Sequence, residues 1–122
     1  MNNQEAQQLR ADLAQFTGTT HYYQIDRKTL LTDGVYHLCE HAGAYWLVTV
    51  FASYLHELEL SEWFTVLKLE VAGTRAKVTI SDGNDNVLAV QEIEYTDFPL
   101  PNLTLYGCWD SEHWVLMLPS EY

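Results

Sequence analysis

The longest apolar stretch of the chain covers residues 43–55, and it constrains the fold more than any other segment. At 100° per residue its large side chains cover most of a helix, and only Thr49, Ser53 and His56 form a narrow polar stripe. A strand is the alternative, because residues 48–51 favour β structure, but a length above ten residues favours a helix. The stretch is also shorter than the roughly 20 apolar residues that a membrane span needs. It therefore predicts a central helix that is buried on more than one side.

The length of 122 residues, of which 48% are hydrophobic, is typical of one domain with one core. We expect a single domain over residues 1–122. Within it, helices are predicted over about residues 4–58 and a sheet over about residues 63–118, because the apolar periodicity changes from helical to alternating after that point.

Two further helices are predicted on the N-terminal side of the central one. Apolar residues recur at helical spacing over residues 6–16, and Gly18 follows at a position where a glycine typically ends a helix. Thr32 or Asp33 can cap a second helix that begins near Gly34, because either side-chain oxygen can accept a hydrogen bond from a free backbone N–H. These helices complete a predicted set of two or three.

The first hairpin of the sheet is the most strongly specified pair of strands. Apolar and polar residues alternate over residues 66–71 and again over residues 76–81. A two-residue turn at Gly73-Thr74, with glycine first as a type II′ turn prefers, brings the apolar residues of both strands to the same face. The same register sets Glu70 opposite Lys77, a favourable cross-strand pair. The sequence therefore predicts this hairpin and its register.

Three more strands are predicted, over residues 87–95, 103–109 and 114–118. Either the even-numbered or the odd-numbered residues of the first of these can face the core, so its register stays open. Helices followed by a run of strands indicate the α+β class. We expect an antiparallel, largely meander β-sheet of about five strands, with two or three helices packed on one face.

The charge of the chain excludes several functions. Six basic and 17 acidic residues give a formal net charge of −11, and every basic residue lies at or before Lys77. Such an acidic surface repels phosphates, so we expect no direct nucleic-acid binding.

Two cysteines, Cys39 and Cys108, make no disulfide framework at this length. The N-terminus lacks the pattern of a signal peptide, so we expect a cytoplasmic protein that does not bind a membrane.

Motifs for metals and cofactors are weak. His37 and His41 stand four residues apart on one predicted helix, but two ligands do not make a metal site. Residues 82–86 resemble the start of a calcium loop, yet Val87 and Ile93 occupy positions where that loop needs glycine and glutamate. The sequence also has no glycine-rich phosphate loop and no nucleophile elbow. We expect no metal and no cofactor.

The only candidate for acid–base catalysis is His21, paired with either Asp33 or Asp97 if the fold brings them together. Cys39 is predicted to face the core, where a thiolate is disfavoured. Because a histidine and an aspartate occur in almost any chain of this length, a small enzyme is the alternative rather than the leading hypothesis.

The leading hypothesis is an interaction module. Phe64, Val66 and Tyr106 fall on the face of the sheet opposite the predicted hairpin core. An apolar patch rimmed by polar residues marks an interface, unless loops or the N-terminal helix cover it. We therefore expect a non-catalytic, acidic binding module that associates with a protein partner or with itself as a homodimer.

Five motifs are spread over the chain: Phe16-Thr17-Gly18-Thr19, Leu31-Thr32-Asp33-Gly34-Val35, Ala42-Gly43-Ala44-Tyr45-Trp46-Leu47, Tyr95-Thr96-Asp97-Phe98-Pro99-Leu100-Pro101 and Val115-Leu116-Met117-Leu118-Pro119-Ser120-Glu121-Tyr122. Together they resemble a family of small uncharacterised domains found on bacterial chromosomes, plasmids and phages. The resemblance implies one domain of unknown function, an accessory protein of mobile DNA, and no established functional residues.

Overall fold

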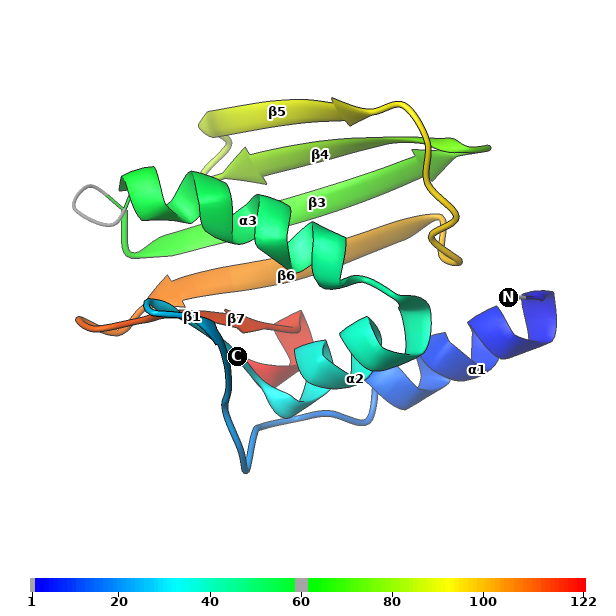
Figure 1. Cartoon of the computed structure of the whole chain (residues 1–122), viewed down its shortest axis with the longest axis horizontal. Helices are drawn as coiled ribbons and strands as arrows, with labels where there is room; N and C mark the ends of the chain where they lie inside the picture. Colours follow the sequence, from blue (N-terminus) through cyan, green and yellow to red (C-terminus); the bar gives the residue numbers. More distant parts are fainter. Residues whose placement is uncertain (1, 59–61) are drawn as a thin grey trace.

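The computed structural model describes residues 2–58 and 62–122, in which helices lie across one face of a twisted sheet (Figure 1). This arrangement confirms the predicted α+β class. The elements in chain order are α1 (Asn3–Leu13), β1 (Tyr23–Asp26), β2 (Thr29–Leu31), α2 (Asp33–Ala42), α3 (Tyr45–Leu58), β3 (Phe64–Ala72), β4 (Arg75–Ser81), β5 (Val87–Ile93), β6 (Asn102–Trp109), β7 (Trp114–Met117) and the 3₁₀ turn η1 (Pro119–Glu121).

The sheet differs from the expected five antiparallel strands. It has seven strands in the order β1-β2-β7-β6-β3-β4-β5, and β2 runs parallel to β7. The expectation missed the β1–β2 hairpin because strands of four and three residues are too short to show an alternating pattern. The meander is also incomplete. After β5 the chain returns to the other edge of β3, where β6 pairs with it.

The predicted β3–β4 hairpin is confirmed with its register. Glu70 pairs with Lys77 and Val71 with Ala76, and Gly73 has the positive φ of 66° that its turn requires. The open register of the next strand is also settled. Ala89, Gln91 and Ile93 share the core face, since they pair with buried residues of β4. A register shift between Ile80 and Ser81 places Val87 opposite Ser81 instead, and Val87 is 59% exposed.

The predicted central helix is α3, and the helix before it is α2. Thr32 caps α2 by accepting a hydrogen bond from the Val35 N–H, and Gly43 ends it in the left-handed conformation at φ 61°. Leu47, Phe51 and Leu55 of α3 are fully buried against the sheet. In the described part of the chain, no helix is long and apolar enough to cross a membrane.

The first helix is shorter than its apolar pattern predicts. It ends at Leu13 with Ala14 as the C-cap, so neither Phe16 nor Gly18 belongs to it. A tight turn follows the helix, in which the Phe16 N–H donates a hydrogen bond to the Leu13 carbonyl at 3.3 Å. Phe16 still packs inward, because its ring lies 5.3 Å from the ring of His37 on α2. Tertiary contact, rather than helix periodicity, explains why an apolar residue stands at this position.

Candidate functional site

The helix-free face of the sheet gathers the three residues predicted as an interface. Helices α2 and α3 lie across the opposite face (Figure 1). Val66 pairs directly with Tyr106, and Phe64 stands two residues before Val66 on the same face. The rings of Phe64 and Tyr106 meet edge to face, with centroids 5.1 Å apart. The structure therefore brings all three residues together on the side of the sheet opposite α2 and α3.

A third ring comes from Tyr122. Its centroid lies 5.4 Å from that of Phe64 and 5.6 Å from that of Tyr106, both in edge-to-face geometry. We call Phe64, Tyr106 and Tyr122 the three-ring cluster. Tyr122 is 67% exposed, whereas Val66 beside the cluster is only 7% exposed. The cluster thus covers part of the face and presents a new aromatic surface, and sequence reasoning missed Tyr122 because its partners are more than 15 residues away.

The strands of the helix-free face are also nearly neutral. Three of the six basic residues of the chain, Lys68, Arg75 and Lys77, occupy positions there, against the acidic residues Glu70 and Glu92. The loop over residues 82–86 adds two aspartates at one rim. These strands and this loop therefore carry three basic and four acidic side chains, while the remainder of the chain carries three basic and thirteen acidic ones. Repulsion against another acidic surface is weakest here.

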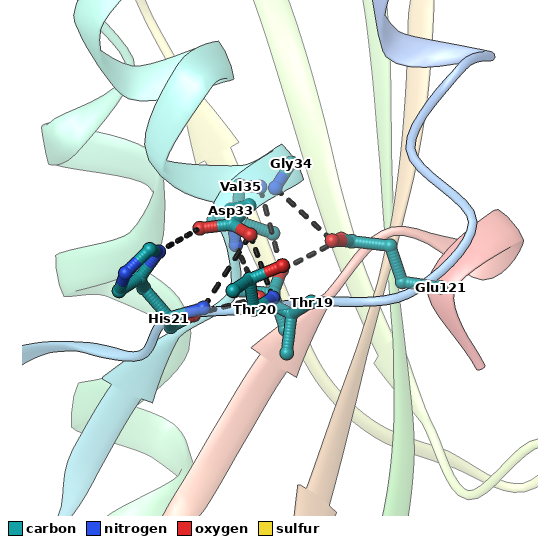
Figure 2. Close-up of polar contacts among 8 residues, drawn as sticks. Thr19, Thr20, His21, Asp33, Gly34, Val35 and Glu121 are labelled. Atoms are coloured by element: carbon teal, nitrogen blue, oxygen red, sulfur yellow. Dashed lines mark hydrogen bonds and ion pairs between the residues drawn. The ribbon is translucent and has the colours of Figure 1, made fainter.

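The N-terminus of α2 holds the most connected group of polar residues (Figure 2). Asp33 accepts the backbone N–H of Thr20 at 2.8 Å and that of His21 at 3.4 Å. Its own N–H donates to Thr19 Oγ1 at 2.8 Å. The hydrogen bond from Thr20 is the main reason that the pKa of Asp33 lies below its ordinary value. Asp33 thereby fastens residues 19–21 to the start of the helix.

Glu121 approaches the same helix start from another side (Figure 2). Its Oε1 accepts Thr32 Oγ1–H at 2.6 Å and the Leu118 N–H at 2.9 Å, and its Oε2 accepts the Gly34 N–H at 3.0 Å. A carboxylate is favourable at this place because the free N–H groups give a helix N-terminus a partial positive charge. Three motifs that lie far apart in the sequence therefore converge on one helix end.

The predicted catalytic candidates are only partly brought together. His21 Nδ1 lies 3.9 Å from Asp33 Oδ1, and the His21 side chain is 71% exposed. Asp97 follows Thr96, which donates to Thr74 at the β3–β4 turn. Strands β2, β7 and β6 separate that hairpin from β1, which His21 precedes. The Asp33 carboxylate also accepts the backbone N–H groups of Thr20 and His21, so it holds the chain turn next to this exposed imidazole.

A second histidine–aspartate pair, which the sequence did not indicate, lies in an open pocket of about 590 Å³. His56 Nε2 is 3.4 Å from Asp26 Oδ2 and 3.2 Å from Thr29 Oγ1. A catalytic triad needs the two ring nitrogens to serve different partners, but here one nitrogen serves both. Thr29 is fully buried, so a substrate cannot reach its hydroxyl. The remaining lining residues are Arg27, Lys28 and Glu112.

His37 and His41 lie on one face of α2, as their spacing predicts, but their rings are stacked 3.9 Å apart. His41 Nδ1 contacts the His37 carbonyl oxygen at 2.9 Å, and His37 Nε2 lies 3.7 Å from Asp12 on α1. Stacked imidazoles do not aim their nitrogens at a common point. Within residues 2–58 and 62–122, no group of three or more histidine, cysteine, aspartate or glutamate side chains is placed to hold a metal ion.

Acidification is expected to destabilise the contact between α1 and α2. Burial first, and the neighbouring His41 second, lower the pKa of His37, while Asp12 opposes the shift. His37 therefore binds a proton less readily in the folded state than in the unfolded chain, where a histidine titrates at about pH 6.5. Neutral His37 therefore makes its full contribution to the free energy of unfolding above that pH, and this contribution declines as the pH falls below it.

The measurement compares thermal melts of the wild type and His37→Gln at about pH 7.5 and about pH 5.5, on either side of the histidine pKa. We expect the wild type to lose more of its melting temperature on acidification than His37→Gln does. His113→Gln, at a histidine that pairs with Asp110 within its own loop, is the control. Equal pH dependence of the wild type and His37→Gln would contradict the assignment.

The comparison with protein families gives a match over nearly the whole chain. A profile described as a family of unknown function, DUF6876, matches residues 7–122. The chain belongs to this family. The match runs from Gln7, within α1, to Tyr122, so both the three-ring cluster and the convergence at the start of α2 lie within the DUF6876 region. This agrees with the resemblance to a family of uncharacterised domains.

A solved structure has a fold similar to that of this chain. It is the crystal structure of a protein of unknown function from Enterococcus faecalis, and it aligns with 81% of this chain and 93% of its own length. The TM-score is 0.52 at 14% sequence identity, a likeness that concerns the fold alone. The search of curated proteins found no match to the chain.

Proposed function

We propose that the chain is a non-catalytic interaction module that pairs with a second copy of itself through the helix-free face of its sheet. The observation that carries the proposal is the three-ring cluster, because large aromatic side chains held at a surface are the typical anchors of protein interfaces. Tyr122 in particular leaves 67% of its surface in water although it packs against two other rings.

The choice of a second copy as the partner follows from charge. A chain with a net charge of −11 repels its own copies over most of its surface. The helix-free face has three basic against four acidic side chains, so it is the surface where two copies repel each other least. Pairing about a two-fold axis also places identical aromatic residues together, which is usual in homodimers.

Catalysis is the weaker alternative because neither the His21–Asp33 pair nor the His56–Asp26 pair has all the features that acid–base chemistry needs. Asp33 beside His21 is engaged with backbone N–H groups, and the Thr29 hydroxyl beside His56 is buried.

The proposal also places the protein in the cytoplasm. Both Cys39 and Cys108 are free thiols, and burial raises the pKa of Cys39 to about 12. Unreactive free thiols are typical of proteins in a reducing compartment.

The test is the mass of the protein in solution, measured by size exclusion with light scattering at several salt concentrations. We expect a dimer whose population rises with salt, because salt screens the repulsion between two acidic chains. Phe64→Ser should weaken the dimer by about tenfold or more, since it removes a central ring. Tyr95→Ser, at an aromatic residue that is 72% exposed away from the cluster, should leave it unchanged.

A strictly monomeric mass at about 100 µM protein and about 0.5 M salt, where the screening length is only a few Å, would overturn the proposal. So would a dimer that Phe64→Ser leaves intact, because the face would then have no part in the association.

A further inference from the structure

We infer that Glu121 is the positioning residue of this interface: it ties the C-terminal turn to the start of α2 and thereby holds Tyr122 in the three-ring cluster. The inference rests on the proposed function, since it concerns how the same face is assembled. Glu121 itself need not touch the second copy. Its role is to act through Tyr122, the next residue in the chain.

The anchor is made of three hydrogen bonds to one carboxylate. The Glu121 carboxylate accepts hydrogen bonds from the Thr32 hydroxyl at 2.6 Å, the Gly34 N–H at 3.0 Å and the Leu118 N–H at 2.9 Å. One donor belongs to Thr32, the N-cap of α2, one to Gly34 in its first turn, and one to Leu118, just before η1. Hydrogen bonds to an ionised acceptor are stronger than neutral ones. Glu121 therefore joins η1 to a helix on the opposite face of the sheet.

Tyr122 needs such an anchor. A side chain that is two-thirds exposed gains little by burial, and fixing it in one place costs conformational entropy. Tyr122 makes two edge-to-face ring contacts, and its N–H donates a hydrogen bond to the Pro119 carbonyl within the same turn. The turn is held in place by Glu121, so loss of the anchor frees the ring.

The exposure of Tyr122 also sets the direction of the effect. Tyr122 covers part of Phe64 and Tyr106, but it presents its own ring to solvent in their place. It therefore completes the surface that a second copy contacts, and release of the anchor weakens pairing.

Gly34 provides a way to release the anchor without touching the interface. A Cβ at Gly34 would lie 2.6 Å from Leu118 Cδ1 and 2.7 Å from Glu121 Oε1, so both side chains must move. Gly34 is in the first turn of α2, where alanine is otherwise the better helix former. Gly34→Ala should thus displace Glu121 while the helix keeps its shape.

The experiment measures the dimer dissociation constant by sedimentation equilibrium for the full chain and its variants. Glu121→Gln, Gly34→Ala and Tyr122→Ala should each weaken the dimer by about tenfold. The double variant Glu121→Gln/Tyr122→Ala should be no weaker than Tyr122→Ala, because Glu121 acts only through the ring. Gly18→Ala is the matched control, since nothing lies within 4 Å of its added Cβ.

A second measurement separates this inference from the proposed function. Nuclear Overhauser contacts between the Tyr122 and Phe64 rings, recorded on dilute protein, should be present in the wild type and Gly18→Ala and lost in Gly34→Ala and Glu121→Gln. If these contacts persist in both anchor variants, the inference is wrong whatever the oligomeric state. If Phe64→Ser breaks the dimer while Glu121→Gln leaves its dissociation constant unchanged, the inference is wrong and the interaction module stands.

Discussion

Phe51→Ala is expected to lower the free energy of unfolding by about 3–5 kcal/mol, the range for truncation of a buried aromatic side chain. Phe51 is fully buried on the face of α3 that packs against the sheet. Its ring also lies beside the backbone of β6, since a Cβ at Gly107 would come within 2.9 Å of its Cζ atom. Removal of the ring therefore leaves a cavity between the two layers, and a loss of this size is a large part of the stability of a small domain.

Urea unfolding provides the measurement, with Thr49→Ala as the control at an exposed position of the same helix. The control should change the stability by less than about 0.5 kcal/mol, as surface substitutions usually do. Trp46 belongs to the same apolar stretch but is only partly buried, so its truncation should cost less than that of Phe51. Equal midpoints for Phe51→Ala and the wild type would show that α3 is not the central element of the core.

Gly107→Ala is expected to lower the free energy of unfolding by about 1–3 kcal/mol, the usual cost of adding an atom to a packed core. The added Cβ would stand 2.8 Å from Thr65 Oγ1, 2.9 Å from Phe51 Cζ and 3.0 Å from Leu55 Cδ1. Two of these atoms belong to side chains of α3 and one to a side chain of the neighbouring strand β3, so these side chains, or the helix that carries two of them, must shift. Glycine is needed at this position because the helix crosses the sheet closely here.

The same substitution at Gly18, where nothing lies within 4 Å of the added Cβ, is the control and should be nearly neutral. Thermal or urea melts of both variants provide the comparison. If Gly107→Ala were as stable as Gly18→Ala, the close approach of α3 to β6 would be wrong.

The convergence at the start of α2 explains part of the motif pattern. Thr19, Thr32, Asp33, Gly34 and Glu121 all belong to motifs that carry the family resemblance, and all of them meet at this helix end. Their spacing along the chain is large, so nothing in the sequence alone showed that they form one group. Their hydrogen bonds give them a structural reason to be present, and catalysis is not needed to explain them.

Local patterns determined much of the fold from the sequence. The apolar run over residues 43–55 predicted α3, and Thr32 and Gly43 stand at the two ends of α2 as capping chemistry favours. The β3–β4 hairpin followed with its register, because turn type, apolar alternation and the Glu70–Lys77 pair all require the same alignment. Each of these features depends on residues that are close in the chain.

The tertiary structure alone decided which distant segments meet. Strand β2 has only three residues, and its parallel pairing with β7 joins parts of the chain about 85 residues apart, as in Leu31 with Leu116. Glu121 likewise binds groups 87 and 89 residues away, and Tyr122 joins a cluster with Phe64. A sequence shows which residues are apolar or acidic, but long-range partners are selected by the packing of the whole chain. The aromatic face was therefore predictable as a patch, whereas the carboxylate that holds its third ring was not.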